Sequence, residues 1–397
     1  MLETMQILVL GLSYVGLGIG SVPGLRMNRA TIALVGSAIL IALGTVSLKA
    51  AWMAIDAATI IFLLSMMVIN AYLAYAGFFK LALMRLLQLT RSPLGLLLLL
   101  TFGTGALSAV FLNDTLAIVS TPLTLQLTRS LKLNPVPYLL AIAGATNIGS
   151  LATISGNPQN ILVGSYSGIT YLAFLQALAP VAIIGLGLQI GLLWLLYPEV
   201  RSRQSCPWPE LPRLRLNRPL LRKTIGVTSV LLVAFVVGLP LTESAFLAAA
   251  ALLITRRIKP QRVLQEVDWS LLVLFSGLFI LTYCVQSLQL LNYFANWVAN
   301  PVGLIVVTTG LSNLISNVPT VLLLQSFIPP NATQSWLLLA ASATLAGNLT
   351  LFGSVANLIM VEAVGAQGQS LSFGEHLRFG VPLTLMTLAV TYAWIGR

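Results

Sequence analysis

Polar residues interrupt a very apolar chain at four places, and these interruptions hold the side chains best suited to chemistry. The first is Asn113-Asp114-Thr115, in the middle of the apolar segment 93–128. A carboxylate at membrane depth is costly, so Asp114 is a candidate site for a proton or a cation such as Na⁺. Asp is also a favoured helix cap, and the residue pattern leaves that purely structural role open.

The other three interruptions consist of small and amide residues. A glycine can end one half of a helix, and an Asn or Ser can cap the next half. Each new helix then presents free N–H groups and the positive end of its dipole, which suits an anion or a polar neutral oxyacid. These three interruptions are Gly156-Asn157-Pro158, Ser316-Asn317 and Gly353-Ser354.

Several kinds of chemistry have no residues to support them. His376 is the only histidine, so no histidine cluster exists for a zinc site, and we expect His376 to lie at a membrane interface. No phosphate-binding glycine loop is present, and no cluster of acid and base groups. The sequence therefore predicts no enzyme, no cofactor and no structural metal. No Lys or Arg falls in a predicted membrane core, so dipoles, amides and hydroxyls would hold an anion.

The elements that position these residues are membrane spans. Of the 397 residues, 57% are hydrophobic and only 8% are charged, against about 25% in soluble domains. A crossing needs about 20 apolar residues. Ten stretches qualify: 7–24, 30–48, 57–78, 137–164, 170–197, 223–239, 242–255, 269–287, 335–362 and 375–395.

The positive charges predict an orientation. If the N-terminus lies outside, every Lys and Arg except Lys49 and Arg397 falls in an inside loop. The positive-inside rule produces this asymmetry, so we expect a multi-pass protein of the inner or plasma membrane. The basic, proline-rich loop 198–222 is then cytoplasmic, which argues against binding of nucleic acid.

This loop divides the chain into two similar halves, 1–197 and 223–397. Each half has a hairpin (93–128 and 301–328) followed by a broken helix (137–164 and 335–362). Aligning 153–160 with 350–357 matches Thr153 with Thr350, Gly156 with Gly353, and Asn160 with Asn357.

Five crossings per half place the second half upside down relative to the first. The arms of the second hairpin have about 11 residues, or about 16 Å, which cannot cross a core of about 30 Å. We therefore predict an all-α polytopic membrane protein of ten transmembrane helices and two re-entrant hairpins. Inverted repeats with broken helices indicate a secondary transporter.

Several motifs resemble a known family. Asn113-Asp114-Thr115, the stretch from Ala145 to Ser150, and Gly156-Asn157-Pro158-Gln159-Asn160 are similar to the arsenite/antimonite permease and sodium–proton antiporter branch of the ion transporter superfamily. Ser316-Asn317-Val318-Pro319 and the stretch from Ala346 to Asn357 resemble the second half of that branch. The resemblance covers nearly the whole chain, although the paired Ser-Asn-Thr signatures of dicarboxylate carriers are absent.

The resemblance implies a site between the hairpin tips and the broken helices. It assigns substrate or coupling-ion binding to Asn113, Asp114, Thr115, Asn157, Asn160, Asn317, Asn348, Ser354 and Asn357, and we add their neighbours Gly156, Ser316 and Gly353.

The leading hypothesis is a secondary carrier that moves a small inorganic anion or oxyacid, similar to arsenite, by alternating access. Protons or another cation would be coupled to this movement. A sodium–proton antiporter is the main alternative, followed by an organic-anion (dicarboxylate) carrier or a channel. The sequence leaves open a homodimer and a cytoplasmic ATPase partner.

Overall fold

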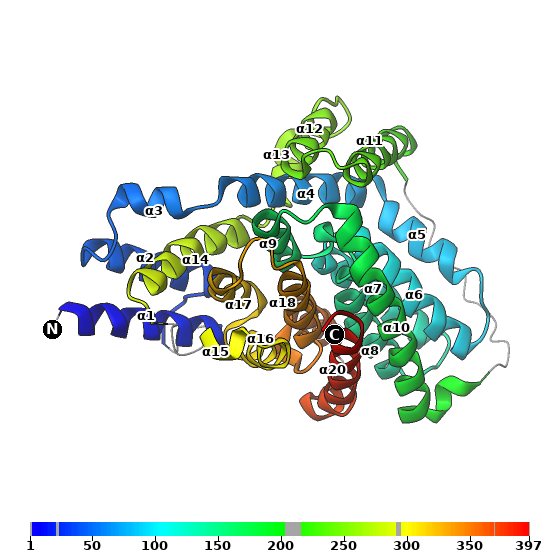
Figure 1. Cartoon of the computed structure of the whole chain (residues 1–397). Helices are drawn as coiled ribbons and strands as arrows, with labels where there is room; N and C mark the ends of the chain where they lie inside the picture. Colours follow the sequence, from blue (N-terminus) through cyan, green and yellow to red (C-terminus); the bar gives the residue numbers. More distant parts are fainter. Residues whose placement is uncertain (1, 21–23, 203–215, 291–294, 369, 397) are drawn as a thin grey trace.

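Every regular element in the described part of the chain is helical (Figure 1). The computed structural model describes residues 2–20, 24–202, 216–290, 295–368 and 370–396. Seven helices are long and apolar enough to cross a membrane, which confirms the all-α polytopic prediction. They are α1 (Leu2–Ile19), α4 (Ala57–Ala76), α6 (Pro93–Val110), α10 (Tyr171–Leu196), α11 (Arg218–Val237), α14 (Trp269–Ser287) and α20 (Phe373–Ile395).

The other predicted crossings are shorter or broken helices. Two are the apolar helices α2 (Arg29–Ala42) and α12 (Leu241–Leu253). The two predicted broken helices are both present. In the first, α8 (Val136–Ser150) and α9 (Pro158–Ser167) flank the 3₁₀ turn η1 (Ile154–Gly156). In the second, α18 (Thr333–Ala346) and α19 (Val355–Gly365) flank η5 (Leu351–Gly353).

Both predicted hairpins form, and their turns fall where the Asn residues stand. The first consists of α6 and α7 (Asn113–Ser130), which are joined at Phe111-Leu112. The second consists of α16 (Pro301–Ile315) and α17 (Asn317–Leu324). At 15 and 8 residues, its arms are about 22 Å and 12 Å long, too short to cross a core of about 30 Å.

The turn of the second hairpin is strained. Ser316 joins α16 to α17 with φ 85° and ψ 159°, a region that is essentially reserved for glycine. Holding a serine there costs about 1–3 kcal/mol, which the surrounding packing must offset. The next three residues, Asn317 to Pro319, are all buried. The tip is therefore held inside the protein and not in a solvated loop.

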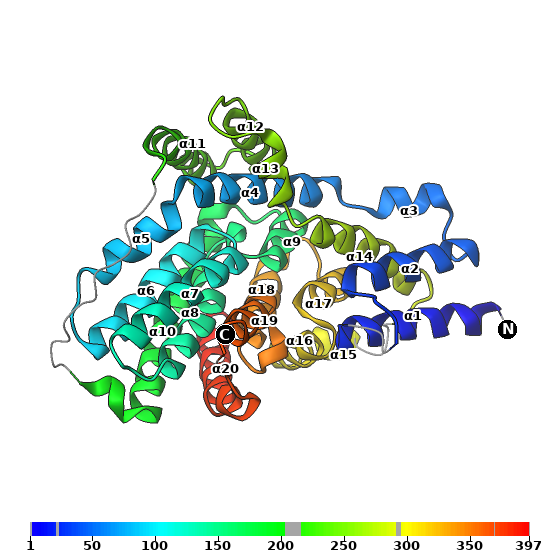
Figure 2. The ribbon, with the colours of Figure 1, turned by 180° about the vertical axis from the view of Figure 1, so that it is seen from behind.

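The two halves meet in the middle of the molecule. Figures 1 and 2 show α9, α17 and α18 between a group formed by α1, α2 and α14 and a group formed by α6, α8 and α10. Helix α18 packs against α9 and α8 of the first half, and α19 packs against α7. The polar breaks of both inverted halves consequently lie at one central seam.

Some details differ from the sequence-based expectations. Helix α1 ends at Ile19, earlier than expected, and α2 ends at Ala42, where a short turn leads to α3 (Leu48–Ala54). The basic residues Lys80 and Arg85 lie on a separate helix, α5 (Phe78–Leu87), which begins after Gly77 at φ 82°. Residues 203–215 of the predicted linker lie outside the described residues. Two further short helices are α13 (Pro260–Gln265) and α15 (Ala295–Val298).

Candidate functional site

The polar breaks surround a small central pocket of about 70 Å³. Five of the predicted site residues line it, and they come from three of the four breaks. The fourth break, at the start of α9, contributes neighbours of predicted residues, Pro158 and Gln159. The five predicted residues in the wall are Asn113, Asp114, Ser316, Asn317 and Ser354.

Four helices begin at this pocket: α7, α9, α17 and α19. The first N–H groups of a helix have no partner within it, and its N-terminus has a partial positive charge of about half an elementary charge. Only the start of α9 has a side-chain cap, because Asn157 Oδ1 accepts a hydrogen bond from Asn160 N at 2.8 Å. For α7, α17 and α19 no side-chain cap is present. Their N–H groups are therefore suited to an anion or an oxyacid.

Asp114 lies in this wall without a partner. Its backbone N–H donates to Asn113 Oδ1 at 3.0 Å. Within the described residues, its carboxylate has no hydrogen bond and no ion pair, and it does not cap α7. The purely structural role that the sequence left open is therefore absent. Asn317 is similar, because its Oδ1 is buried without a partner. Two oxygen acceptors in the pocket are consequently free to bind a hydroxyl group or a cation.

Predicted residues outside the wall hold the two broken helices together. Asn160 Nδ2 donates to Ser150 O at 3.0 Å and to Thr153 O at 2.9 Å. Asn357 Nδ2 donates to Gly347 O at 2.9 Å. Each Asn thus reaches a carbonyl ten residues earlier, at the end of the preceding half-helix, where such groups lack helical partners. The pair matched in the sequence alignment has the same role in both halves.

Gly156 and Gly353 are required for close packing at the breaks. A Cβ on Gly156 would lie 2.4 Å from Ser150 O, and one on Gly353 would lie 2.9 Å from Asn313 Oδ1. Ser354 does not cap α19 as the sequence suggested, because its hydroxyl instead donates to Asn147 Oδ1 at 3.0 Å. Thr115 is half-buried near the first tip but outside the pocket wall.

Comparisons with known proteins agree with this geometry. A profile of the citrate transporter family matches residues 17–332, which is most of the chain. The chain belongs to the citrate transporter family. It is therefore an integral multi-pass membrane protein and a secondary transporter of the anion permease kind, and it is not an enzyme.

The alignments with known relatives cover nearly the full length of this chain. It is 31% identical to the silicon efflux transporter LSI3 of Oryza sativa subsp. japonica over 95% of this chain and 94% of that one. It is 24% identical to the putative transporter arsB of Dictyostelium discoideum, with 92% and 87% covered. The crystal structure of the YdaH transporter of Alcanivorax borkumensis matches with a TM-score of 0.58 at 14% identity, covering 100% and 98%. That likeness supports the fold alone.

Asn147, which we did not predict as a site residue, connects three other residues of the site in this citrate transporter family member. Its Nδ2 donates to Asn348 Oδ1 at 2.8 Å, and its Oδ1 accepts from Ser354 and, at 3.5 Å, from Asn113. Asn147 lies in the stretch from Ala145 to Ser150 that resembles the permease branch, so the sequence did contain a signal that pointed to it.

Thr344 of α18 is a second connection that the sequence did not reveal. Its hydroxyl accepts from Asn157 Nδ2 and Gln159 Nε2, each at 3.2 Å, and donates to Asn160 Oδ1 at 3.2 Å. A threonine in an apolar helix has no distinguishing pattern in one sequence, so nothing pointed to it.

Two charge-bearing residues lie elsewhere than expected. Arg29, assigned to an inside loop, lines the central pocket, so a guanidinium accompanies the dipoles, amides and hydroxyls that were expected to hold an anion alone. The side chain of His376, a residue expected at a membrane interface, is buried inside the protein, with Nε2 3.1 Å from Asn348 O. Both residues lie in the first turn or so of a helix, where sequence alone cannot distinguish an inward from an outward side chain.

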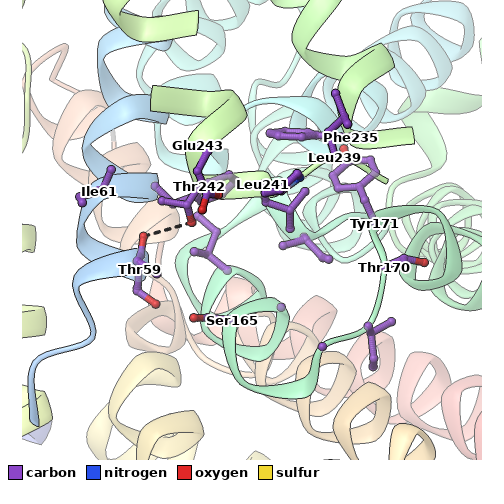
Figure 3. A pocket seen from close by; sticks show the side chains of 18 of the residues that line it. Thr59, Ile61, Ser165, Thr170, Tyr171, Phe235, Leu239, Leu241, Thr242 and Glu243 are labelled. Atoms are coloured by element: carbon purple, nitrogen blue, oxygen red, sulfur yellow. Dashed lines mark hydrogen bonds between the residues drawn. The ribbon is translucent and has the colours of Figure 1, made fainter. Parts of the chain in front are cut away.

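A larger cavity, of about 660 Å³, lies away from the four helix starts. Figure 3 shows it between α4, the end of α9, the start of α10 and the turn between α11 and α12. Its wall is mostly apolar, and Glu243 is its one charged residue among those described. Tyr171 lines it, and the Tyr171 hydroxyl lies 3.1 Å from Ser155 Oγ in the first broken helix. The size of this cavity does not make it the substrate site, because it lacks converging polar groups.

Proposed function

We propose that this transporter moves a small inorganic anion or oxyacid by alternating access, coupled to protons or another cation. The observation that supports this most is the central pocket, where four helix N-termini and an unpaired carboxylate meet. Helix N-termini favour negative charge and hydrogen-bond acceptors. Asp114 and Asn317 Oδ1 in the same wall suit donors, such as the hydroxyl groups of an oxyacid.

The size of the pocket supports a small substrate. A volume of about 70 Å³ is well below the roughly 300–1,000 Å³ of pockets for drug-sized ligands. A tricarboxylate, suggested by the family's name, would need the pocket to widen considerably. The relative named as a silicon efflux transporter agrees with a small oxyacid as the substrate class.

In this proposal the site residues divide into two groups. Asn113, Asp114, Ser316, Asn317 and Ser354 contact substrate or coupling ion, with Asp114 binding the proton or cation. Asn157, Asn160, Asn348 and Asn357 hold the broken helices in position. The halves divide at 198–222, and the hairpins and broken helices move against the remaining helices.

The test is a flux assay in proteoliposomes with a panel of arsenite, silicic acid, phosphate and citrate, under imposed proton and sodium gradients. We expect saturable uphill flux of at least one inorganic species, and none of citrate. The proposal would be refuted if citrate alone were transported, or if no substrate ever moved against its own concentration gradient.

A sodium–proton antiporter is the second candidate. It is favoured by the oxygen atoms at the pocket, because the Asp114 carboxylate and Asn317 Oδ1 are ligands that a hard cation prefers. In vesicles containing a pH-sensitive dye and no oxyacid, sodium-driven proton movement would favour this candidate. Dependence of proton movement on an added oxyacid would favour the first.

A further inference from the structure

The central pocket has one positively charged side chain in its wall. Among the described residues that line it, only Arg29 and Asp114 bear charge. Arg29 is the first residue of α2 and is half-buried. Its guanidinium remains protonated at any ordinary pH, so it is a fixed positive charge in the same wall as a titratable carboxylate.

The end of α1 holds Arg29 in place. Its Nε–H donates to Leu17 O at 3.1 Å. Leu17 lies in the last turn of α1, where carbonyl groups lack helical partners and the helix dipole is negative. A guanidinium is well suited to this position, since it satisfies a carbonyl oxygen and lies at the negative end of the dipole.

The same end of α1 abuts the second hairpin. A Cβ on Gly18 would lie 2.2 Å from Leu314 O, two residues before the tip at Ser316. Leu17, Ile315 and Ser316 all line the pocket together with Arg29. The guanidinium is therefore positioned relative to the hairpin tip by direct backbone packing.

The remaining hydrogen-bonding capacity of Arg29 is unused. Within the described residues, the bond from Nε to Leu17 O is its only hydrogen bond, and no ion pair joins it to Asp114. Arginine has five N–H donors and binds oxyanions through two of them at once. Four donors on the two Nη atoms consequently remain for a ligand in the pocket.

We propose that Arg29 makes this pocket prefer the charged form of an oxyacid over the neutral form. The inference rests on the proposed function and extends it to a residue outside the polar breaks. The Asp114 carboxylate would repel an anion bound in the pocket, and the guanidinium in the same wall would attract it. A neutral oxyacid needs only the hydrogen bonds of the breaks, so Arg29 contributes little to its binding.

The experiment compares Arg29→Gln and Arg29→Lys with the wild-type chain. Arg26→Gln is the matched control, because Arg26 is exposed and outside the pocket wall. Binding of inorganic phosphate, an anion, and of arsenous acid, which is neutral near neutral pH, is measured on the purified full chain by ligand-induced thermal stabilisation. Gel filtration checks that each variant is folded.

We expect Arg29→Gln to weaken phosphate binding at least tenfold while changing arsenous acid binding less than about twofold. Arg29→Lys should retain most of the preference for phosphate, and Arg26→Gln should match the wild type. An equal loss for both ligands would show that Arg29 only holds α1 in place. The inference would also be overturned if the wild-type chain bound neither ligand, or bound arsenous acid but not phosphate. This experiment measures binding and not flux. A failure of the proposed transport function would therefore appear in the flux assay as a separate result.

Discussion

Asn147 Nδ2 donates a hydrogen bond to Asn348 Oδ1 at 2.8 Å, and this bond joins the two halves of the transporter at the buried centre of the molecule. Both side chains are almost fully buried, at 2% and 1% exposure. The same Asn147 accepts a bond from Ser354 at the start of α19. This amide therefore links the end of one half-helix to the beginning of another in the opposite half.

Replacing Asn147 with Ala should destabilise the fold and impair transport together. Asn348 Oδ1 and the Ser354 hydroxyl would lose a partner in a buried region, at about 1–3 kcal/mol for each unsatisfied group. Thermal unfolding in detergent and flux in proteoliposomes measure the two effects. Asn331→Ala, at an exposed position, is the control. An Asn147→Ala protein with wild-type stability would contradict the structure.

Asp114→Asn should abolish ion coupling without unfolding the protein. Asn keeps the size of the side chain but cannot take up a proton or offer a charged ligand to a cation. Glu362→Gln is the control, since it neutralises an exposed carboxylate outside the pocket wall. Flux under an imposed pH or sodium gradient is the measurement. If Asp114→Asn still responds to both gradients, Asp114 is not the coupling site.

Asn160→Ala should cost more stability than Asn357→Ala. Asn160 Nδ2 reaches the carbonyls of Ser150 and Thr153, and its Oδ1 accepts from Thr344, whereas Asn357 Nδ2 reaches Gly347 O alone. Counting unsatisfied buried groups, we expect a loss of about 3 kcal/mol for the first and about 1 kcal/mol for the second. Chemical denaturation of both variants checks the order, and a reversed order would count against these bonds.

Gly18→Ala should separate α1 from the second hairpin. The added methyl group would lie 2.2 Å from Leu314 O, a backbone atom that cannot rotate away. We expect reduced flux and a loss of about 1–3 kcal/mol. Gly11→Ala on the same helix has open space around its Cβ and should be neutral or stabilise by up to about 1 kcal/mol. Equal behaviour of the two variants would refute the close approach.

The orientation can be tested by labelling with a membrane-impermeant maleimide. Lys49 and Arg256 are both exposed, and the positive-inside rule places them on opposite sides. Cys206 is first replaced by Ser, and Cys284 is buried and protected. We expect Lys49→Cys to react in intact cells and Arg256→Cys to react only after permeabilisation. The opposite pattern would invert the proposed topology.

The breaks were predictable from sequence because each places amides and glycines inside an apolar segment. The alignment of Asn160 with Asn357 even identified two residues with the same hydrogen-bond role. Arg29 was not predictable, because a basic residue at the start of a helix has the same pattern whether it faces a loop or a pocket. Its direction depends on where α1 ends, and that depends on packing against α16.

The role of Ser354 was missed for a similar reason. A serine before a helix favours a local cap, but a buried amide from the other half competes for the same hydroxyl, and Asn147 accepts its bond. Such competition between local and distant partners is decided by tertiary packing. The short helices α5 and α13 were also missed, because at 10 and 6 residues they are too short to be recognised as membrane spans and their basic residues resemble those of loops.

The bonds from Asn160 and Asn357, each to a carbonyl ten residues upstream, have a consequence for motion. Each interruption is bridged by a hydrogen bond within its own broken helix, so neither broken helix is free to lengthen or rewind as a hinge during a transport cycle. In the proposed cycle, displacement instead occurs where the hairpins and broken helices, moving together, meet the remaining helices, while the bonds of Thr344 and of the amide pair Asn147 and Asn348 are kept. The two broken helices would then form one rigid unit that carries the pocket, with the breaks keeping their shape throughout the cycle.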